Sequence, residues 1–200
     1  VLSHCNGDAA ADQFIAAVER AAATHPSTDR RPVMVHAQTV REDQLDRMAT
    51  LGILPSFFAS HVYYWGDYHR DVVMGPERAA RISPTRYARR RGLRFNIHND
   101  SPVVPPDILR LVWSAAARRT RSGELLGPDQ AVTVEEALRA VTLDAAFAHF
   151  EDREKGSLAP GKLADLVILS DDPTEVSLED IQFIRVEATL KDGSLIYGDF

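Results

Sequence analysis

Strand-like and helical segments alternate along most of this sequence, and that alternation constrains the fold most strongly. Residues 32–37 form an almost continuous apolar run, which is the pattern of a strand covered on both faces. A helical pattern over residues 41–51 follows, and Gly52 can end that helix as its C-cap. Because successive right-handed strand–helix units place parallel strands side by side, the sequence predicts an α/β fold with a parallel sheet.

The same order recurs on both sides of this unit. We expect further strands at residues 1–3, 53–58 and 93–98, a helical turn at 75–78, and helices at 9–24, 85–91, 107–120, 134–141 and 143–150. We expect residues 61–69, which are the most aromatic part of the chain, to form a long irregular loop. A loop of this length is usually functional or disordered, and so many aromatic rings argue against disorder.

The pattern changes at Gly156, where a turn begins that extends over residues 156–162. Strands are predicted at residues 164–169, 184–190 and 195–197, and the last two are joined by a hairpin turn at residues 191–194. This tail is therefore a small β unit. We expect residues 1–155 to form one unit and residues 156–200 to form another.

The composition excludes several classes of function. The formal net charge is -6 and the pI is about 5.6, so we expect no nucleic-acid partner, and we interpret Arg89, Arg90 and Arg91 as a solvated helix end. No apolar run approaches the roughly 20 residues that span a bilayer, so no membrane association is expected. The single cysteine, Cys5, rules out an internal disulfide and favours a reducing, cytoplasmic location.

Ionisable residues stand where three of the predicted strands end: His4, His36 and Asp100. His61 follows the remaining strand. Taken singly, a strand-end histidine is usually a hydrogen-bonded structural residue, and Asn-Asp-Ser-Pro is ordinary turn chemistry for Asp100. The tips of parallel strands face one pocket, however, where two imidazoles and a carboxylate can bind a divalent metal such as zinc. The same carboxylate can take a proton from a metal-activated water. The residues alone leave both interpretations open.

Several segments, in order along the chain, resemble motifs of the C-terminal part of the amidohydrolase superfamily. The resemblance is greatest to its amidohydrolase-3 branch, the YtcJ-like and N-substituted formamide deformylase-like metal-dependent hydrolases. The matching segments are residues 4–10, 35–38, 52–56, 75–78, 99–103 and 156–167. The most specific of them are Asn-Asp-Ser-Pro-Val at residues 99–103 and the Gly-Ser-Leu-Ala-Pro-Gly-Lys segment that begins at Gly156.

This resemblance implies a fold and a set of site residues. The fold would be the C-terminal half of a (β/α)8 TIM barrel, with its strands five to eight, plus part of a small β-sandwich. The implied metal ligands are His4, His36 and Asp100, and the metal would be zinc, as one or two ions in the intact enzyme. Asp100 and His61 are the expected catalytic residues. The expected substrate-binding residues are His61 and Asp67 from the resemblance, and Tyr64 and Trp65 from the aromatic loop, which suggests an apolar or aryl substituent on the substrate.

The resemblance also implies an activity, namely hydrolysis of the C–N bond of a small amide or N-substituted formamide by metal-activated water. Two alternatives remain open. A deaminase or an esterase could use the same site, and a metal-free remnant could act as a binding or assembly module.

Two departures from the family pattern bear on partners and on the pocket. The family's strand-one H-x-H pair and its strand-four bridging residue do not occur in these 200 residues. The chain also starts as if inside a strand, so we expect a missing N-terminal barrel half, from the same protein or another chain, and a homo-oligomer is also open. In addition, His98 and Asn99 stand where small residues are more usual, so we expect an altered pocket or an added polar contact.

Overall fold

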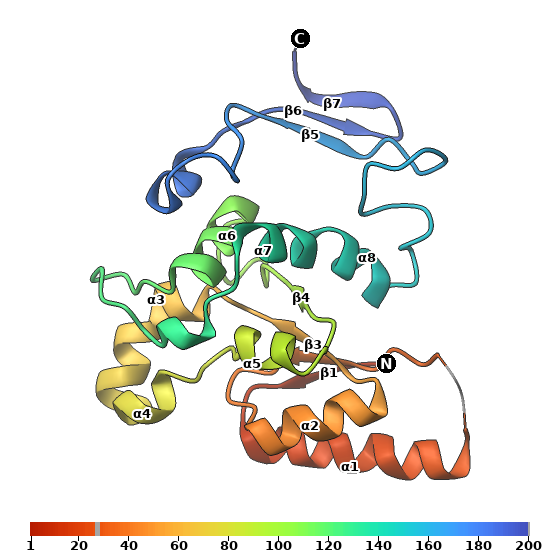
Figure 1. Ribbon diagram of the computed structural model, residues 1–200, viewed down its shortest axis with the longest axis vertical. Coiled ribbons are helices and arrows are strands. Elements are labelled where there is room, and N and C mark those ends of the chain that lie inside the picture. Colours follow the sequence, from red (N-terminus) through yellow and green to blue (C-terminus); the bar gives the residue numbers. More distant parts are fainter. Residues whose placement is uncertain (27–28, 200) are drawn as a thin grey trace.

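The computed structural model describes residues 1–26 and 29–199 and confirms the predicted α/β class (Figure 1). Four parallel strands form one sheet in the order β1-β2-β3-β4. Their bounds are β1 (Leu2–Cys5), β2 (Val33–His36), β3 (Leu54–Phe57) and β4 (Asn96–Ile97). Each strand lies beside its sequential neighbour, which is the arrangement expected of consecutive strand–helix units in a barrel segment.

Helices connect these strands and continue after the last one. Figure 1 shows α1 and α2 below the parallel sheet and α6 to α8 above it. The helical elements are α1 (Asp8–Thr24), α2 (Glu42–Leu51), α3 (His61–Tyr68), the π-helical turn η1 (His69–Val73), α4 (Gly75–Ala79), α5 (Thr85–Arg90), α6 (Ile108–Ala117), the 3₁₀ turn η2 (Pro128–Gln130), α7 (Val134–Val141) and α8 (Leu143–Ala148). Among the described residues, no helix combines the length and the apolar character needed to cross a membrane.

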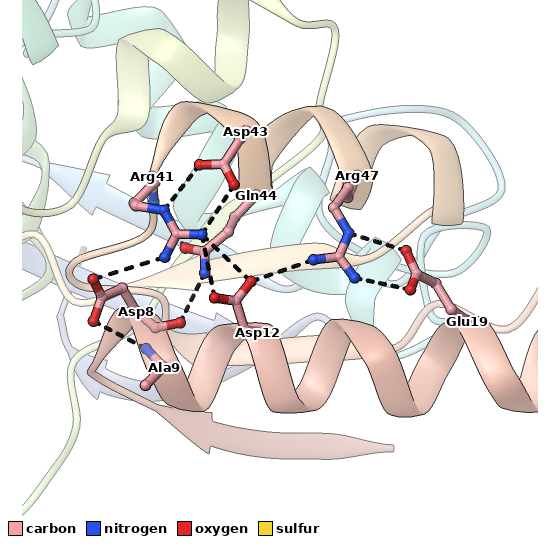
Figure 2. A network of polar contacts seen from close by, with 8 residues as sticks. All are labelled: Asp8, Ala9, Asp12, Glu19, Arg41, Asp43, Gln44 and Arg47. Atoms are coloured by element: carbon pink, nitrogen blue, oxygen red, sulfur yellow. Dashed lines mark hydrogen bonds and ion pairs between the residues drawn. The ribbon is translucent and has the colours of Figure 1, made fainter.

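Ion pairs join α1 to α2 along their exposed sides (Figure 2). Arg47 of α2 contacts Glu19 at 2.8 Å and Asp12 at 3.3 Å, and Arg41 contacts Asp12 at 3.2 Å. Exposed pairs of this kind each contribute about 0–1 kcal/mol, so they set the alignment of the two helices more than their stability. The stabilising contribution comes from the buried sides of the helices. Side chains with no exposed surface there are Ile15, Leu45 and Met48.

The main core lies between the parallel sheet and the helices that cover it. Phe57 is fully buried from β3, as are Met34 from β2 and Ile53 from the turn before β3. Each large apolar side chain that is fully buried contributes roughly 1.5–3 kcal/mol. The core therefore holds the C-terminal ends of β2, β3 and β4 in fixed register, with His36 opposite Phe57 and Phe57 opposite Ile97.

The C-terminal segment forms the small β unit that the sequence predicts. Strands β5 (Leu166–Leu169), β6 (Val186–Lys191) and β7 (Ser194–Gly198) make an antiparallel sheet in the order β5-β6-β7. The 3₁₀ helix η3 (Leu178–Phe183) joins this sheet to the first unit, since its Ile181 is fully buried in the main core. The division at residue 156 remains a prediction.

The prediction of an irregular loop at residues 61–69 was wrong, because that segment is helix α3 continued by η1. Val62 and Gly66, one helical turn apart, are both buried. A Cβ on Gly66 would lie 2.8 Å from Cγ2 of Thr120 and 3.0 Å from Cδ2 of Leu126. The helix therefore depends on close approach to residues far away in the sequence, and its own composition carries little helical signal.

Two further elements are shorter than predicted. The strand expected at residues 93–98 is reduced to β4, because the Leu93 amide bonds to the Ala88 carbonyl and closes α5 instead. The helix expected at residues 107–120 ends at Ala117, because Arg118 adopts a left-handed backbone with φ of 53°. Asp107 caps this helix, since its side chain accepts a hydrogen bond from the Arg110 amide.

Candidate metal centre

The parallel register brings the C-terminal ends of all four strands to the same level. Cys5 pairs with His36, His36 with Phe57, and Phe57 with Ile97. His36 is therefore the last residue of β2, and His98 comes directly after β4. Ligands of parallel α/β folds collect at this carboxyl edge of the sheet.

The tightest cluster of potential metal ligands consists of His36, His98 and Asp100. One ligand atom from each of these residues lies within 4.8 Å of the other two. Nδ1 of His36 and Nε2 of His98 are 3.2 Å apart. Two imidazole nitrogens bound to one tetrahedral zinc at the usual Zn–N length of about 2.0–2.1 Å lie about 3.3 Å apart. The three side chains thus fit a divalent ion both in donor chemistry and in spacing.

The ring of His98 is held in place by its neighbours. Oγ of Ser56 lies 2.9 Å from Nδ1 of His98, which leaves Nε2 directed at His36. The Phe58 ring stacks on the His98 ring with centroids 5.7 Å apart. Metal-binding histidines usually bond their second ring nitrogen to a nearby oxygen, and this contact fixes tautomer and orientation. Ser56 is placed to play that part for His98.

The backbone is strained at two members of the cluster. His36 has φ of 72° and Asp100 has φ of 60°, both in the left-handed region. A non-glycine residue held there costs on the order of 1–3 kcal/mol, and such residues concentrate at functional sites. The strain at both strand ends supports a functional interpretation of the cluster over a purely structural one.

Burial keeps the imidazoles of the cluster neutral. His36 is only 4% exposed, and burial lowers its pKa, although Asp100 partly opposes that shift. Burial, together with His36, lowers the pKa of His98 to about 4. Neutral imidazole is the form that binds metals, so both rings are ready for coordination at pH 7 without losing a proton.

The structure places the other two predicted histidines beside this cluster. His4 lies within β1 rather than after it, is exposed, and its ring meets that of His36 edge-on with centroids 4.5 Å apart. His61 begins α3, and its ring centroid lies 5.7 Å from that of His36. Burial lowers the pKa of His61 to about 3. His4 falls outside the tightest cluster, so its role as a ligand remains a prediction.

The predicted substrate-binding residues of α3 take different positions. The Trp65 ring packs against His61 and Phe58, with centroids 5.9 and 6.0 Å away, and Tyr64 packs against Trp65. The Asp67 carboxylate instead accepts a hydrogen bond from the Ser122 hydroxyl at 2.8 Å and pairs with Arg70 at 3.2 Å. Contact of these three residues with substrate remains a prediction.

Two residues of the site were missing from the predicted set. His98 lies two positions before Asp100, and residues i and i+2 of an extended chain share a face, which was an available signal. His69 starts η1 and its ring centroid lies 6.3 Å from that of His61. His69 is eight residues after His61, so the two side chains lie on the same face only if the segment is a helix. No helix was predicted there.

Comparison with known proteins shows the family of this chain. The model of the amidohydrolase family, of the amidohydrolase-3 type, matches residues 1–197. The N-substituted formamide deformylase of Arthrobacter pascens is 31% identical over 194 residues, covering 97% of this chain and 36% of that protein. The putative amidohydrolase YtcJ of Bacillus subtilis (strain 168) is 24% identical, covering 98% of this chain and 37% of that protein. The chain thus spans little more than a third of either relative's length.

A solved structure shows the same fold. An uncharacterized metal-dependent hydrolase from Pyrococcus horikoshii OT3 superposes with a TM-score of 0.75 at 25% sequence identity, covering 90% of this chain and 35% of that one. The family match, which extends over nearly all of the sequence, and the shared parallel sheet lead to one conclusion: this chain belongs to the amidohydrolase family.

Proposed function

We propose that the protein containing this chain is a metal-dependent hydrolase that cleaves the C–N bond of a small amide, in particular an N-substituted formamide. The observation that carries this proposal is the cluster of His36, His98 and Asp100 at the carboxyl edge of the parallel sheet. The relative named N-substituted formamide deformylase, at 31% identity, supports the choice of substrate class.

The side chains suggest how the site would be loaded. His36, His98 and Asp100 would hold a divalent ion, with His4 beside them, and their nitrogen and oxygen donors suit zinc. The chemistry that such an ion supplies is a lower pKa for the attacking water and a polarised substrate carbonyl. One or two ions would be bound in the intact enzyme.

Asp100 would be the residue that transfers the proton from the attacking water. Its carboxylate would take the proton from the attacking water and then pass it to the departing nitrogen. That second transfer matters because an amine leaves an amide only once its nitrogen is protonated. His61, kept neutral by burial, can donate a hydrogen bond near the carbonyl oxygen without carrying a charge of its own. Tyr64 and Trp65 would form the wall for an apolar or aryl substituent.

The proposal extends to the setting of this site. The relatives are much longer than this chain, so we propose that a further barrel half, in the same protein or in another chain, or a second copy, pairs with the outer edges of β1 and β4. Leu2 of β1 is 61% exposed, in keeping with an edge that another segment covers. A cytoplasmic location is proposed because the single cysteine suits a reducing compartment.

Metal-dependent hydrolysis by the full-length protein tests this function. The protein is stripped with a chelator, reloaded with zinc and given a panel of N-substituted formamides, larger amides, esters and cyclic amidines. Zinc-dependent release of amine from the formamides is expected, and Asp100→Asn should lower kcat by about 10³-fold or more, while His25→Asn, outside the site, serves as the control. Hydrolysis that ignores both zinc and Asp100, or turnover of only the esters or amidines, would refute the proposal.

A further inference from the structure

Two buried ring nitrogens next to the candidate metal cluster lack a hydrogen-bond partner among the described residues. They are Nδ1 of His61 and Nδ1 of His69. The two rings lie with centroids 6.3 Å apart and nearly perpendicular planes. Buried polar atoms are almost always bonded, so two such atoms together indicate a place where another molecule completes the bonding.

Gln38 determines which nitrogen of His69 carries the proton. Nε2 of Gln38 lies 2.9 Å from Nε2 of His69. An amide nitrogen can only donate, so the imidazole Nε2 accepts and the neutral ring is protonated at Nδ1. Burial lowers the pKa of His69, which keeps the ring neutral at pH 7. His69 therefore presents a buried N–H donor that the described residues do not use.

The residue that orients His69 is held in place through its backbone. Gln38 is 4% exposed, and its backbone carbonyl accepts a 2.8 Å hydrogen bond from the Ser83 backbone amide. Gln38 also lies two residues after His36. The residue that orients the His69 donor therefore belongs to the same backbone segment as His36 of the metal cluster.

The His61 ring is a neighbour of both the His36 ring and the His69 ring. Both belong to the continuous helical segment formed by α3 and η1, which brings residues eight positions apart to the same face. The His61 ring contacts His36 on one side, at 5.7 Å between centroids, and His69 on the other. A π-helical turn such as η1 is often found at functional sites. A substrate with its scissile carbonyl near His61 would extend its substituent toward His69.

We propose that His69 is a specificity-determining residue whose Nδ1–H, oriented by Gln38, donates a hydrogen bond to a neutral oxygen on the substrate's N-substituent. This inference rests on the proposed amide hydrolysis and narrows its substrate class. The preferred substrates are amides whose substituent combines an apolar ring, packed near Trp65, with an ether or carbonyl oxygen.

A pair of matched substrates tests this proposal on the zinc-loaded full-length protein. One is an N-aryl formamide with a ring methoxy group, and the other is the same compound with an ethyl group in its place. The wild type should favour the methoxy compound in kcat/KM, chiefly through a lower KM. The His69→Phe variant keeps the ring but loses the donor, so the ratio of the two kcat/KM values should fall about tenfold. His25→Phe, the same change at an exposed histidine outside the site, should leave the ratio unchanged.

Ring ¹⁵N spectra of His69 give a second readout that does not depend on turnover. The wild type should show protonation at Nδ1, and that signal should shift when the methoxy compound is added. The Gln38→Leu variant should show a mixture of tautomers and a smaller substrate preference, while zinc content stays that of the wild type. This variant also decides the matter if His69→Phe fails to fold.

The outcomes separate the inference from the proposed function. Hydrolysis of both compounds without any preference, an equal loss for both in His69→Phe, or protonation of His69 at Nε2 would each overturn the inference while the amide hydrolysis stands. If the wild type hydrolyses neither compound, the proposed function fails. The Nδ1–H signal then decides alone: a shift on adding the methoxy compound supports the inference, and no shift overturns it.

Discussion

At the scale of single residues, the site depends on histidines that the fold keeps uncharged. His36, His61, His69 and His98 all have a pKa lowered by burial, and their rings lie in contact along the carboxyl edge of the sheet. Neutral rings can bind a metal or donate through one nitrogen, whereas several imidazolium ions so close together would repel one another. Because these buried rings resist protonation, the stability of the folded protein should fall in acid.

Acid should therefore destabilise the metal-free protein. Burial lowers the pKa of His61 to about 3 and that of His98 to about 4, from the ordinary histidine value of 6.5. The unfolded chain then binds more protons than the folded one below about pH 6.5, so stability is complete above that pH and is lost as pH falls toward 4. We expect each of the two rings to contribute roughly 2 kcal/mol, so the free energy of unfolding, measured with urea in EDTA, should be roughly 4 kcal/mol lower at pH 5 than at pH 7.5.

Replacing His61 with Gln should flatten part of this pH dependence, whereas His25→Gln, at an exposed position, should leave it intact. An unfolding free energy that stays constant from pH 7.5 to pH 5 in the wild type would show that these rings are not held neutral by burial.

Residue-level reasoning named two members of the cluster, His36 and Asp100, and left out the third, His98; their roles in a site remain predictions. His36 and Asp100 were identified because each follows an apolar strand, and the end of a strand is readable from sequence. His98 was not named as a candidate ligand because the predicted strand extended through it, which made it one alternating residue among several. Only the observed register, with Ile97 opposite Phe57, shows that β4 ends just before His98.

At the scale of elements, long-range packing decided what local sequence did not. Helix α3 was predicted as a loop because its aromatic residues give no clear periodicity, and Gly66 in its interior disfavours a helix. Contact of Gly66 with Thr120 and Leu126 overrides that preference. Helix α7 could be predicted because its signals are local, and in the structure Thr133 and Glu136 form a capping box at its start.

Arg118 is the residue that ties several of these elements together. It is fully buried, and its guanidinium donates to the carbonyls of Ile82 at 2.9 Å, Ser83 at 3.3 Å and Leu126 at 3.0 Å. Burial lowers its pKa to about 9, so it remains charged at pH 7. Because Ser83 in turn bonds to Gln38, this arginine braces the segment that orients His69.

Replacing Arg118 with Met should destabilise the protein by about 2–4 kcal/mol, since three carbonyls would lose their donors. The neighbouring Arg119→Met is the matched control: Arg119 pairs with Glu179 in an exposed position, and its loss should cost no more than about 1 kcal/mol. Urea denaturation of both variants measures the difference. Equal losses would mean that the buried contacts of Arg118 add nothing to stability.

At the scale of the whole molecule, the order of strands and helices could be predicted from the sequence, but what lies against the outer edges of the parallel sheet could not. Each strand–helix unit, and the change to a β tail after Gly156, is encoded in short segments. Strands β1 and β4 are the outer strands of the parallel sheet, and each has one neighbouring strand among the described residues. The tail sheet also has exposed apolar residues, and the sequence does not indicate what covers them. Among them are Val167, Leu195 and Ile196.

We expect the 200-residue chain, produced alone, to bind the dye ANS and to self-associate, because unpaired strand edges and exposed apolar faces seek partners. The full-length protein should do neither. Light scattering and dye fluorescence on the two samples, at equal concentration, measure this. A monomeric, dye-free short chain would show that its edges need no further barrel segment.

The most direct measurement is the zinc content of the full-length protein, determined by elemental analysis on the wild type and on His36→Ala, His98→Ala, Asp100→Ala and the control His25→Ala. The close spacing of the first three side chains predicts that near-stoichiometric zinc in the wild type and the control falls sharply in each of the three site variants. Zinc that stays at the wild-type level in all three, or a wild type that binds none, would contradict a metal centre at this edge of the sheet.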